Sequence, residues 1–403
     1  MKLLWIGEYN NKEILELLLG YGYNPMSITI AQDNLIKGIK KYYPIDTISG
    51  CRLPQAKNIN SIFFKNIKWE DSDLSNHFFV SLLNIKYLEI IYKSIMIKKA
   101  VYKWVETNKN EECHIIIYGL HFPYLTCIPY IKKIKTHSIT CIVPDLPEFY
   151  DFNMSRFKKA LKRIDSLIID KYKKYIDRYI LFSEKMSEYF KPPILNYLVM
   201  EGSINEDYYN KLVNKTIRFR NNKIILLYSG SVSYGYGLDK LIDAFYLIPD
   251  NKFELWIVGS GNAIKMINMA TNKDKRIKYL GHINDREKLF SIQINASIMV
   301  NMIPPDNIAT KYCFPSKLFE YMLSGNPVLS FRLEGINKEY LKYLAIIENT
   351  SNEAIANKII EIGNLSQKER NIIGKNARDF ILNHKTNYIQ AEKILNFIKP
   401  NFF

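Results

Sequence analysis

The sequence is poor in cysteine, glycine and proline. Its 403 residues include only 17 glycines and 15 prolines, which argues against a long low-complexity linker or a disordered chain. The few cysteines are widely spaced, odd in number and contain no C-x-x-C pair, so neither a disulfide framework nor a zinc site is indicated, and we predict a reducing compartment. They are Cys51, Cys113, Cys127, Cys141 and Cys313.

Long apolar runs are also missing. The start, MKLLWIGEYNN, is interrupted by Glu8 and is too short for the apolar part of a signal peptide. The most apolar stretch, residues 114–131, contains Gly119, Pro123 and Pro129 and is therefore interpreted as a strand, a loop and a helix. We expect no membrane-spanning segment and a cytoplasmic protein, with peripheral contact at the inner membrane face as a further possibility.

Acidic residues are outnumbered. The chain has 56 Lys and Arg against 40 Asp and Glu, for a net charge of +16. Such a charge fits nucleic acid, an anionic membrane or phosphorylated small molecules, although an AT-rich genome would also raise the lysine content without a functional reason. The 29 tyrosines and 21 phenylalanines are scattered rather than interleaved with arginine in a binding motif, so we expect no nucleic-acid partner.

Short apolar runs alternate with longer helical stretches. This alternation predicts parallel sheets with crossover helices, and a polar stretch from about residue 201 to 223 separates two such series. We therefore predict domains at residues 1–200 and 201–386, followed by a helix in 387–403 that caps the second domain or crosses back to the first. The predicted strands lie at KLLWIG, 115–119, 139–143, 179–183, 224–230, 255–261, 277–281, 297–302 and 327–331.

The segment FPSKLFEYMLSGNPV, residues 314–328, carries local signals that agree with one another. Pro315 suits a first helical turn and Gly325 the position after a helix end, so we predict a helix from Pro315 to Ser324 and a strand from about Pro327. The helical period separates an apolar face from a polar one. The polar face consists of Lys317, Glu320 and Ser324.

Two of these polar residues suit a nucleotide. A helix N-terminus with Lys317 in its first turn offers positive charge to a diphosphate, and an ionised Glu320 can accept hydrogen bonds from both hydroxyls of a ribose. Spacing alone also allows a plain i,i+3 ion pair on a solvated helix face, worth about 0.2–0.5 kcal/mol.

The segment resembles the donor-binding signature of the retaining family 4 glycosyltransferases (glycosyl transferases group 1). Residues 228–245, 255–261 and 276–304 resemble the preceding parts of that family's C-terminal domain, in the same order. The resemblance implies an α/β GT-B fold, in which two Rossmann-like domains with parallel sheets face each other across a cleft. It implies a donor site formed by Gly7, Gly230, Ser231, Gly259, Phe314, Pro315, Ser316, Lys317 and Glu320.

The first domain resembles the family more thinly, through segments such as IIIYGLHFPYL (115–125) and CIVPDLPEF (141–149). The resemblance places Gly7 in a loop that faces the donor phosphates. Asp145 follows a strand, where it would orient or deprotonate an acceptor hydroxyl, and His121 would contact a sugar. The alternatives are a plain turn for Gly7, a surface or helix-capping aspartate, and a histidine without a functional role.

The sequence departs from the family pattern at three places. Tyr312 stands where the family has the first of two glutamates, and Pro144 stands where many members have a histidine before Asp145. Ser231 and a Gly-Tyr-Gly turn replace the arginine and lysine that hold the diphosphate. Donor binding is then expected to depend on Lys317, backbone N–H groups and Ser231.

The resemblance implies transfer of a hexose or N-acetylhexosamine, with retention, from a UDP-sugar, or a GDP-sugar, to a glycan or lipid-linked oligosaccharide in surface polysaccharide synthesis. The 201–386 domain would bind the donor and the 1–200 domain the acceptor, with no metal and no cofactor beyond the donor substrate. A non-catalytic partner subunit and a nucleotide-sugar epimerase are the alternatives. The basic amphipathic stretch 156–178 suggests contact with an anionic membrane, or a helix packed on its own domain.

Overall fold

The computed structural model defines two compact units. The first comprises Met1–Phe182, Met186–Ser203 and Asn387–Phe403, and the second comprises Ser183–Lys185 and Ile204–Thr386. The chain thus leaves the first unit and returns to it at its C-terminal end. The structure describes residues 1–20, 27–51, 62–85, 88–146, 166–190, 193–194, 196–215, 222–306 and 308–400.

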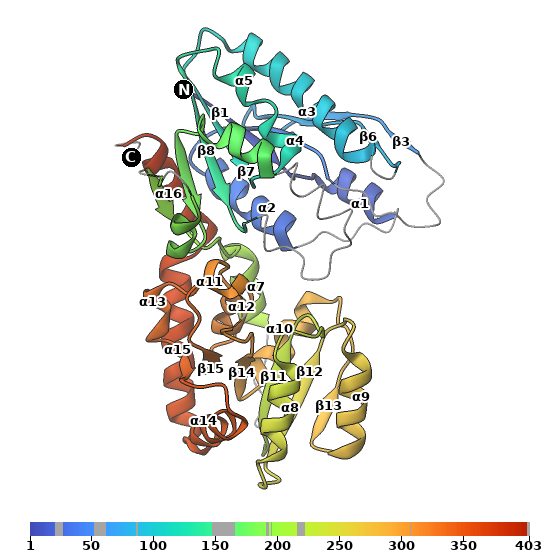
Figure 1. Cartoon of the computed structure of the whole chain (residues 1–403), viewed down its shortest axis with the longest axis vertical. Helices are drawn as coiled ribbons and strands as arrows, with labels where there is room; N and C mark the ends of the chain where they lie inside the picture. The colour runs from blue at the N-terminus through green and yellow to red at the C-terminus, as the bar shows by residue number, and fades with distance from the viewer. Residues whose placement is uncertain are drawn as a thin grey trace. The chain divides into compact units, whose positions relative to one another are not determined.

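An eight-stranded sheet, counted within the described residues, forms the centre of the first unit (Figure 1). Its strand order is β10-β9-β8-β7-β1-β2-β5-β4, and every pairing is parallel except β4 with β5. The central strands β1 and β7 are buried almost throughout, as expected for a parallel sheet covered on both faces. The strands are β1 (Lys2–Gly7), β2 (Asp46–Ser49), β4 (Ile67–Glu70), β5 (Asn76–Phe79), β7 (Cys113–Tyr118), β8 (His137–Val143), β9 (Arg178–Leu181) and β10 (Tyr197–Val199), and β3 (Phe63–Phe64) pairs separately with β6 (Leu82–Leu83).

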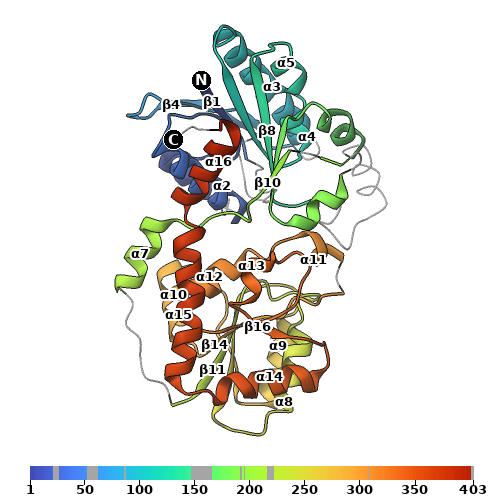
Figure 2. The same cartoon turned by 90° about the vertical axis from the view of Figure 1, so that its left-hand side faces the viewer.

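The last helix of the chain packs on the first unit beside α2, as Figure 2 shows. The contact depends on a glycine, because a Cβ at Gly38 would lie 2.1 Å from the backbone oxygen of Asn387 and 3.0 Å from the Cβ of Ala391. The helical segments of this unit are α1 (Lys12–Gly20), α2 (Ser27–Lys40), α3 (Leu88–Thr107), α4 (Phe122–Leu125), α5 (Ile128–Ile131) and α16 (Asn387–Ile398), and the 3-10 helix Glu184–Tyr189 runs from the second unit into the first.

The second unit holds a wholly parallel sheet in the order β13-β12-β11-β14-β15-β16. Helix α14 packs on α8, and α12 packs on α15. The strands are β11 (Ile224–Ser229), β12 (Phe253–Val258), β13 (Ile277–Tyr279), β14 (Ile298–Asn301), β15 (Val328–Phe331) and β16 (Ala345–Ile347). The helices are α7 (Glu206–Lys215), α8 (Leu238–Tyr246), α9 (Ile264–Lys273), α10 (Arg286–Asn295), α11 (Ile308–Tyr312), α12 (Lys317–Leu323), α13 (Lys338–Leu341), α14 (Asn352–Asn364) and α15 (Gln367–His384).

The described helices include none that combines the length and the apolarity needed to cross a bilayer. Part of the basic stretch discussed above, residues 156–165, lies outside the described residues, and residues 166–173 are helical.

Candidate functional site

Helix α12 is fixed to the rest of the second unit at its C-terminal end. It begins two residues later than the sequence predicts, at Lys317, and Gly325 follows its C-terminal end in the left-handed conformation, with φ 69°. Arg378 of α15 donates hydrogen bonds to the carbonyl oxygens of Leu323 (2.8 Å) and Ser324 (2.5 Å) in the last turn of the helix. The position of the helix is therefore set by tertiary contacts as well as by its apolar face.

A tyrosine of α12 connects the helix to the end of β11. The hydroxyl of Tyr321 donates to the carbonyl oxygen of Ser229 (2.8 Å) and accepts from the amide of the same residue (3.1 Å). The side chain of Ser229 accepts a hydrogen bond from Gln293 of α10 (3.0 Å). These buried contacts hold α12 at the carboxyl end of β11, which is where ligands bind in parallel α/β sheets.

Lys317 is held in a narrow space at this strand end. A Cβ at Gly230 would lie 1.7 Å from Nζ of Lys317, so only glycine at position 230 leaves room for the ammonium group. Nζ lies 5.5 Å from the ring centroid of Tyr228 and 5.4 Å from that of Tyr236, within cation–π range. Burial lowers the pKa of Lys317 to about 8, and the nearby carboxylate of Glu320 partly opposes this effect.

The turn after β11 packs directly on the turn after β12. The amide of Gly230 donates to the carbonyl oxygen of Val258 (2.8 Å). Gly259 has φ 141°, and a Cβ there would lie 1.7 Å from the backbone oxygen of Gly230. The carbonyl oxygen of Ser231 accepts from the hydroxyl of Tyr228 (2.7 Å), and its own hydroxyl donates to Ser233 (2.9 Å). The structure thus brings Gly230, Ser231 and Gly259 to the same place as Lys317.

Glu320 is partly exposed and is held from two sides. Its carboxylate lies 3.9 Å from the guanidinium of Arg286, the first residue of α10. It also accepts a hydrogen bond from Tyr209 of α7, whose pKa is raised well above its ordinary value, first by burial and then by the charge of Glu320. Within the described residues, Glu320 forms an ion pair with Arg286. The alternative hypothesis from the sequence was an ion pair between Glu320 and Lys317.

The remaining residues of the predicted donor site have different surroundings. Phe314 is buried, with ring centroids 5.3 Å from Phe319 and 4.9 Å from Tyr340, and Pro315 is buried next to it. Their contacts are those of core residues. Ser316, by contrast, is exposed at the beginning of α12.

Gly7, predicted to lie in a loop of the first unit, is instead the last residue of β1. Its Cα is covered, since a Cβ at this position would lie 2.1 Å from Oε1 of Gln32 and 2.7 Å from Nε1 of Trp5. The amide of the next residue, Glu8, also donates to Gln32 (2.7 Å), and the carboxylate of Glu8 accepts from the hydroxyl of Thr29 (2.9 Å). The glycine therefore serves a close packing contact at the end of the strand.

The two residues predicted for acceptor chemistry follow neighbouring strands. His121 follows β7 and Asp145 follows β8, and both are partly exposed. Burial, with a smaller effect of the charge on Lys93, lowers the pKa of His121 to about 4, so this imidazole is neutral at pH 7. Burial, followed by the charges of Asp145 and Glu8, raises the pKa of Tyr118, so both carboxylates act on the same tyrosine.

The sequence did not reveal several residues around Lys317 and Glu320, nor one of those near His121 and Asp145. Tyr209, Arg286 and Tyr236 reach Lys317 or Glu320 from segments far away in the chain, and no local pattern indicates that their side chains belong to the site. Glu8 could have been recognised from the sequence, because it directly follows the strand that ends at Gly7.

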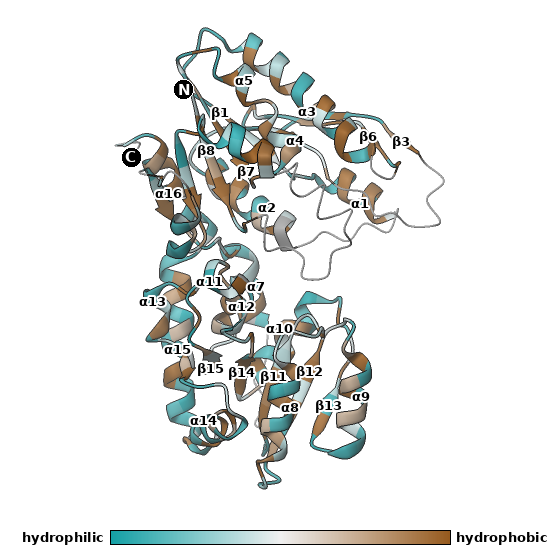
Figure 3. Cartoon of the chain, in the orientation of Figure 1, coloured by the Kyte–Doolittle hydropathy of each residue, from teal (hydrophilic) through white to brown (hydrophobic). Residues whose placement is uncertain are grey.

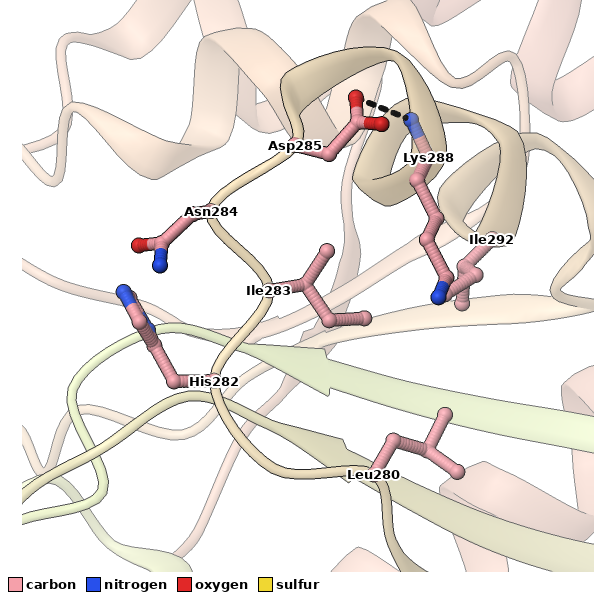
Figure 4. Close-up of a pocket in the computed structure, with 7 residues that line it drawn as sticks. All are labelled: Leu280, His282, Ile283, Asn284, Asp285, Lys288 and Ile292. Carbon is pink, nitrogen blue, oxygen red and sulfur yellow. Dashed lines mark hydrogen bonds between the residues drawn. The ribbon is translucent and has the colours of Figure 1, made fainter.

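A shallow hollow lies between β13 and α10 (Figure 4). Its volume is about 410 Å³. Its lining residues come from both sides of Arg286 in the chain. Asp285 caps α10 by accepting from the amides of Glu287 (2.9 Å) and Lys288 (3.1 Å). The lining residues are Leu280, His282, Ile283, Asn284, Asp285, Lys288 and Ile292.

Comparison with known proteins gives a family match for part of the chain. Residues 212–380 match the family model described as Glycosyl transferases group 1, which covers most of the second unit. No curated protein sequence matches the chain. Many solved structures do match it over nearly the whole length.

Three solved structures show the range of these matches. Sucrose-phosphate synthase from Thermosynechococcus elongatus is 14% identical, with a TM-score of 0.66 over 98% of this chain and 97% of that one. A UDP-forming α,α-trehalose-phosphate synthase from Burkholderia xenovorans, in complex with glucose-6-phosphate, is 10% identical, with a TM-score of 0.63 over 99% and 100%. HepE from Anabaena, in complex with UDP, is 14% identical, with a TM-score of 0.62 over 98% of each chain.

Identities this low establish the fold alone. The chain therefore has the α/β GT-B fold, which confirms the fold predicted from the sequence. Its second unit contains a Glycosyl transferases group 1 domain.

Proposed function

We propose that the chain is a glycosyltransferase that transfers a hexose or N-acetylhexosamine from a nucleotide diphosphate sugar to a glycan or a lipid-linked acceptor. The family model over residues 212–380 supports the reaction class. The single observation that carries the proposal is the placement of Lys317 against Gly230, with Glu320 one helical turn away, at the carboxyl end of β11. UDP is the nucleotide proposed, since HepE, a protein of the same fold, is in complex with UDP.

The site has the charges that this reaction needs. When the glycosidic bond to the donor phosphate breaks, negative charge develops on the leaving diphosphate, and the ammonium of Lys317 stabilises it. The surrounding tyrosines and the Gly230–Gly259 contact fix the direction of that ammonium before the donor arrives. Glu320 would accept hydrogen bonds from the ribose, with Tyr209 and Arg286 fixing its orientation.

Retention is the stereochemical outcome we propose. In such a reaction the leaving diphosphate itself accepts the proton of the acceptor hydroxyl, and the acceptor attacks the face from which the diphosphate departs. This route requires positioning and positive charge more than a protein nucleophile. It is compatible with Tyr312 and Pro144 at positions where relatives carry a glutamate and a histidine.

The acceptor would be bound by the first unit. Asp145 is proposed to orient the attacking hydroxyl, and His121 is proposed to contact a sugar through a neutral ring nitrogen, because its pKa lies far below 7. A role in surface polysaccharide synthesis and a peripheral contact with an anionic membrane belong to the same proposal. Both are supported by the family resemblance and the net charge of +16.

The proposal is tested first by a thermal-shift screen of the purified chain against UDP, GDP, ADP and CMP and their common sugar conjugates. Stabilisation by one nucleotide family names the base. The selected sugar nucleotide is then incubated with and without a glycolipid extract, and free nucleotide is measured. Release that depends on the extract supports transfer, whereas conversion of the sugar without an acceptor supports an epimerase.

A non-catalytic partner subunit is the second candidate, favoured by Tyr312, Pro144 and Ser231 at three positions of the family pattern. It predicts nucleotide binding with neither hydrolysis nor transfer in the same assay. The absence of any thermal shift would contradict both hypotheses, the glycosyltransferase and the non-catalytic subunit, because both require a nucleotide to bind at the donor site.

A further inference from the structure

Helix α3 of the first unit exposes an apolar stripe that the donor site does not use. Leu88, Ile91 and Ile95 are 49, 53 and 44% exposed, although isoleucine and leucine in a packed helix usually face the core. They lie on one side of the helix, since their spacing of three and four residues returns to the same face. Another side of the helix is buried through Ser94, Ile97, Val101 and Val105, although Ile90 in the first turn is 40% exposed.

Neighbouring residues extend this stripe into a patch. Ile62 and Phe63 of the β3 strand region are 60 and 49% exposed, and Ile85 before α3 is 40% exposed. The ring of Phe63 contacts Tyr92 of α3 at 6.2 Å, and the amide of Leu88 donates to the carbonyl oxygen of Ile85. We call the group Ile62, Phe63, Ile85, Leu88, Ile91 and Ile95 the α3 patch. Figure 3 shows the apolar colouring of α3 beside β3 and β6.

The same side of α3 becomes basic toward its C-terminal end. Lys99 and Lys103 are exposed one to two turns after Ile95, and Lys98 lies beside them. Of the two acidic residues in the helix, Glu89 is buried and only Glu106, near the end, is exposed. An apolar surface followed by cations with little opposing charge is the pattern of a helix that lies in the interface of an anionic bilayer.

We propose that the α3 patch docks on an anionic lipid bilayer, with the apolar residues in the acyl boundary and the lysines of α3 at the phosphate level. A second copy of this chain is a poorer occupant. Packing α3 on itself would bring Lys98, Lys99 and Lys103 into an interface with little negative charge to pair them, and buried unpaired charges are costly. This inference rests on the membrane contact in the proposed function and assigns it a surface of the first unit, but it does not depend on the proposed donor site.

The test is flotation of the full chain with two kinds of vesicle, phosphatidylcholine alone and phosphatidylcholine mixed with phosphatidylglycerol. We expect binding to the mixed vesicles that weakens with salt. The variant Ile91→Glu/Ile95→Glu should bind them on the order of tenfold less strongly, because it removes apolar contact and adds negative charge. The matched control Met269→Glu/Ile372→Glu changes two exposed helical residues of the second unit by the same net charge and should bind like the wild type.

Each contrary outcome is informative. No flotation of the wild type with mixed vesicles would overturn membrane docking. Equal flotation of the wild type and the Ile91/Ile95 variant would overturn the α3 patch as the contact. A wild-type dimer in light scattering that becomes a monomer in this variant would show that a second copy covers the patch. Circular dichroism and an unchanged thermal shift with the nucleotide selected above would show that the variant is folded and that its donor site is separate.

Discussion

A Cβ at Gly230 would lie 1.7 Å from Nζ of Lys317. The glycine at the end of β11 therefore leaves the space that the lysine of α12 occupies. This relationship joins two segments nearly ninety positions apart into one site, and several consequences of the proposed donor site follow from it.

Gly230→Ala should weaken nucleotide binding with little loss of stability. The new methyl group meets the flexible end of Lys317 rather than backbone, so the lysine moves aside and the fold is retained. We expect a loss of UDP affinity of about tenfold, measured by calorimetry. Gly20→Ala is the control, because a Cβ there meets nothing within 4 Å. Unchanged affinity in the 230 variant would show that Lys317 does not contact the nucleotide.

The pH dependence of binding should report Lys317. Its pKa in the free protein is about 8, and a bound diphosphate raises that pKa by stabilising the charged form, so binding takes up a proton above pH 8. Affinity for the sugar nucleotide should be flat below about pH 7 and fall by up to about tenfold per pH unit above pH 8. Lys317→Arg keeps its charge over this range and should remove the fall. The same fall in both proteins would assign it to another group.

Glu320→Ala should weaken nucleotide binding without unfolding the protein, since Glu320 is partly exposed. Tyr209→Phe removes only the hydroxyl that donates to Glu320 and should lower affinity about three- to tenfold by loosening the carboxylate. The control is Tyr208→Phe, which removes the hydroxyl of the adjacent residue. The ring of Tyr208, retained in this variant, lies 5.7 Å from the guanidinium of Arg286. Wild-type affinity in the Glu320 variant would mean that the role taken from the family resemblance is wrong.

Gly38→Ala should destabilise the first unit. Its new Cβ meets the backbone oxygen of Asn387 at 2.1 Å, so α16 has to shift away from α2, at a cost of about 1–3 kcal/mol. Hydrogen exchange should show α2 and α16 opening more readily, while β11 and α12 keep wild-type protection. Equal loss of protection in all four elements would indicate that the two units unfold together.

Much of the fold could be predicted because its central strands are short and apolar. The segments IIIY, ITCIV and IILLYS contain little but buried residues, and each forms a strand of the structure. The strands β4 and β5 were missed because IKWE and NHFF are short and carry polar residues, and only β4 is at the sheet edge. The course of the final helix stayed open, since nothing in its own sequence specifies Gly38 as its partner.

Residue spacing alone could predict the candidate site only where its residues share one segment. Lys317 and Glu320 lie on one short helix, so their spacing could be judged from the sequence. Gly230 was predicted through the family resemblance rather than by spacing. Tyr236, Arg286 and Tyr209 join the site only through the packing of β11, α10 and α7. The tight packing around Gly7 likewise depends on Gln32 of α2, which no local pattern indicates.

Lys317 is proposed to hold the diphosphate of a nucleotide sugar, and the decisive measurement is calorimetry of UDP binding to the wild type and to Lys317→Met at pH 7. The wild type should bind UDP and the variant should not. Without ligand, the variant should melt higher, by about 2–4 °C for each kcal/mol gained by removing a largely buried charge whose pKa is depressed to about 8. Equal binding of UDP by both proteins would show that Lys317 does not hold the diphosphate.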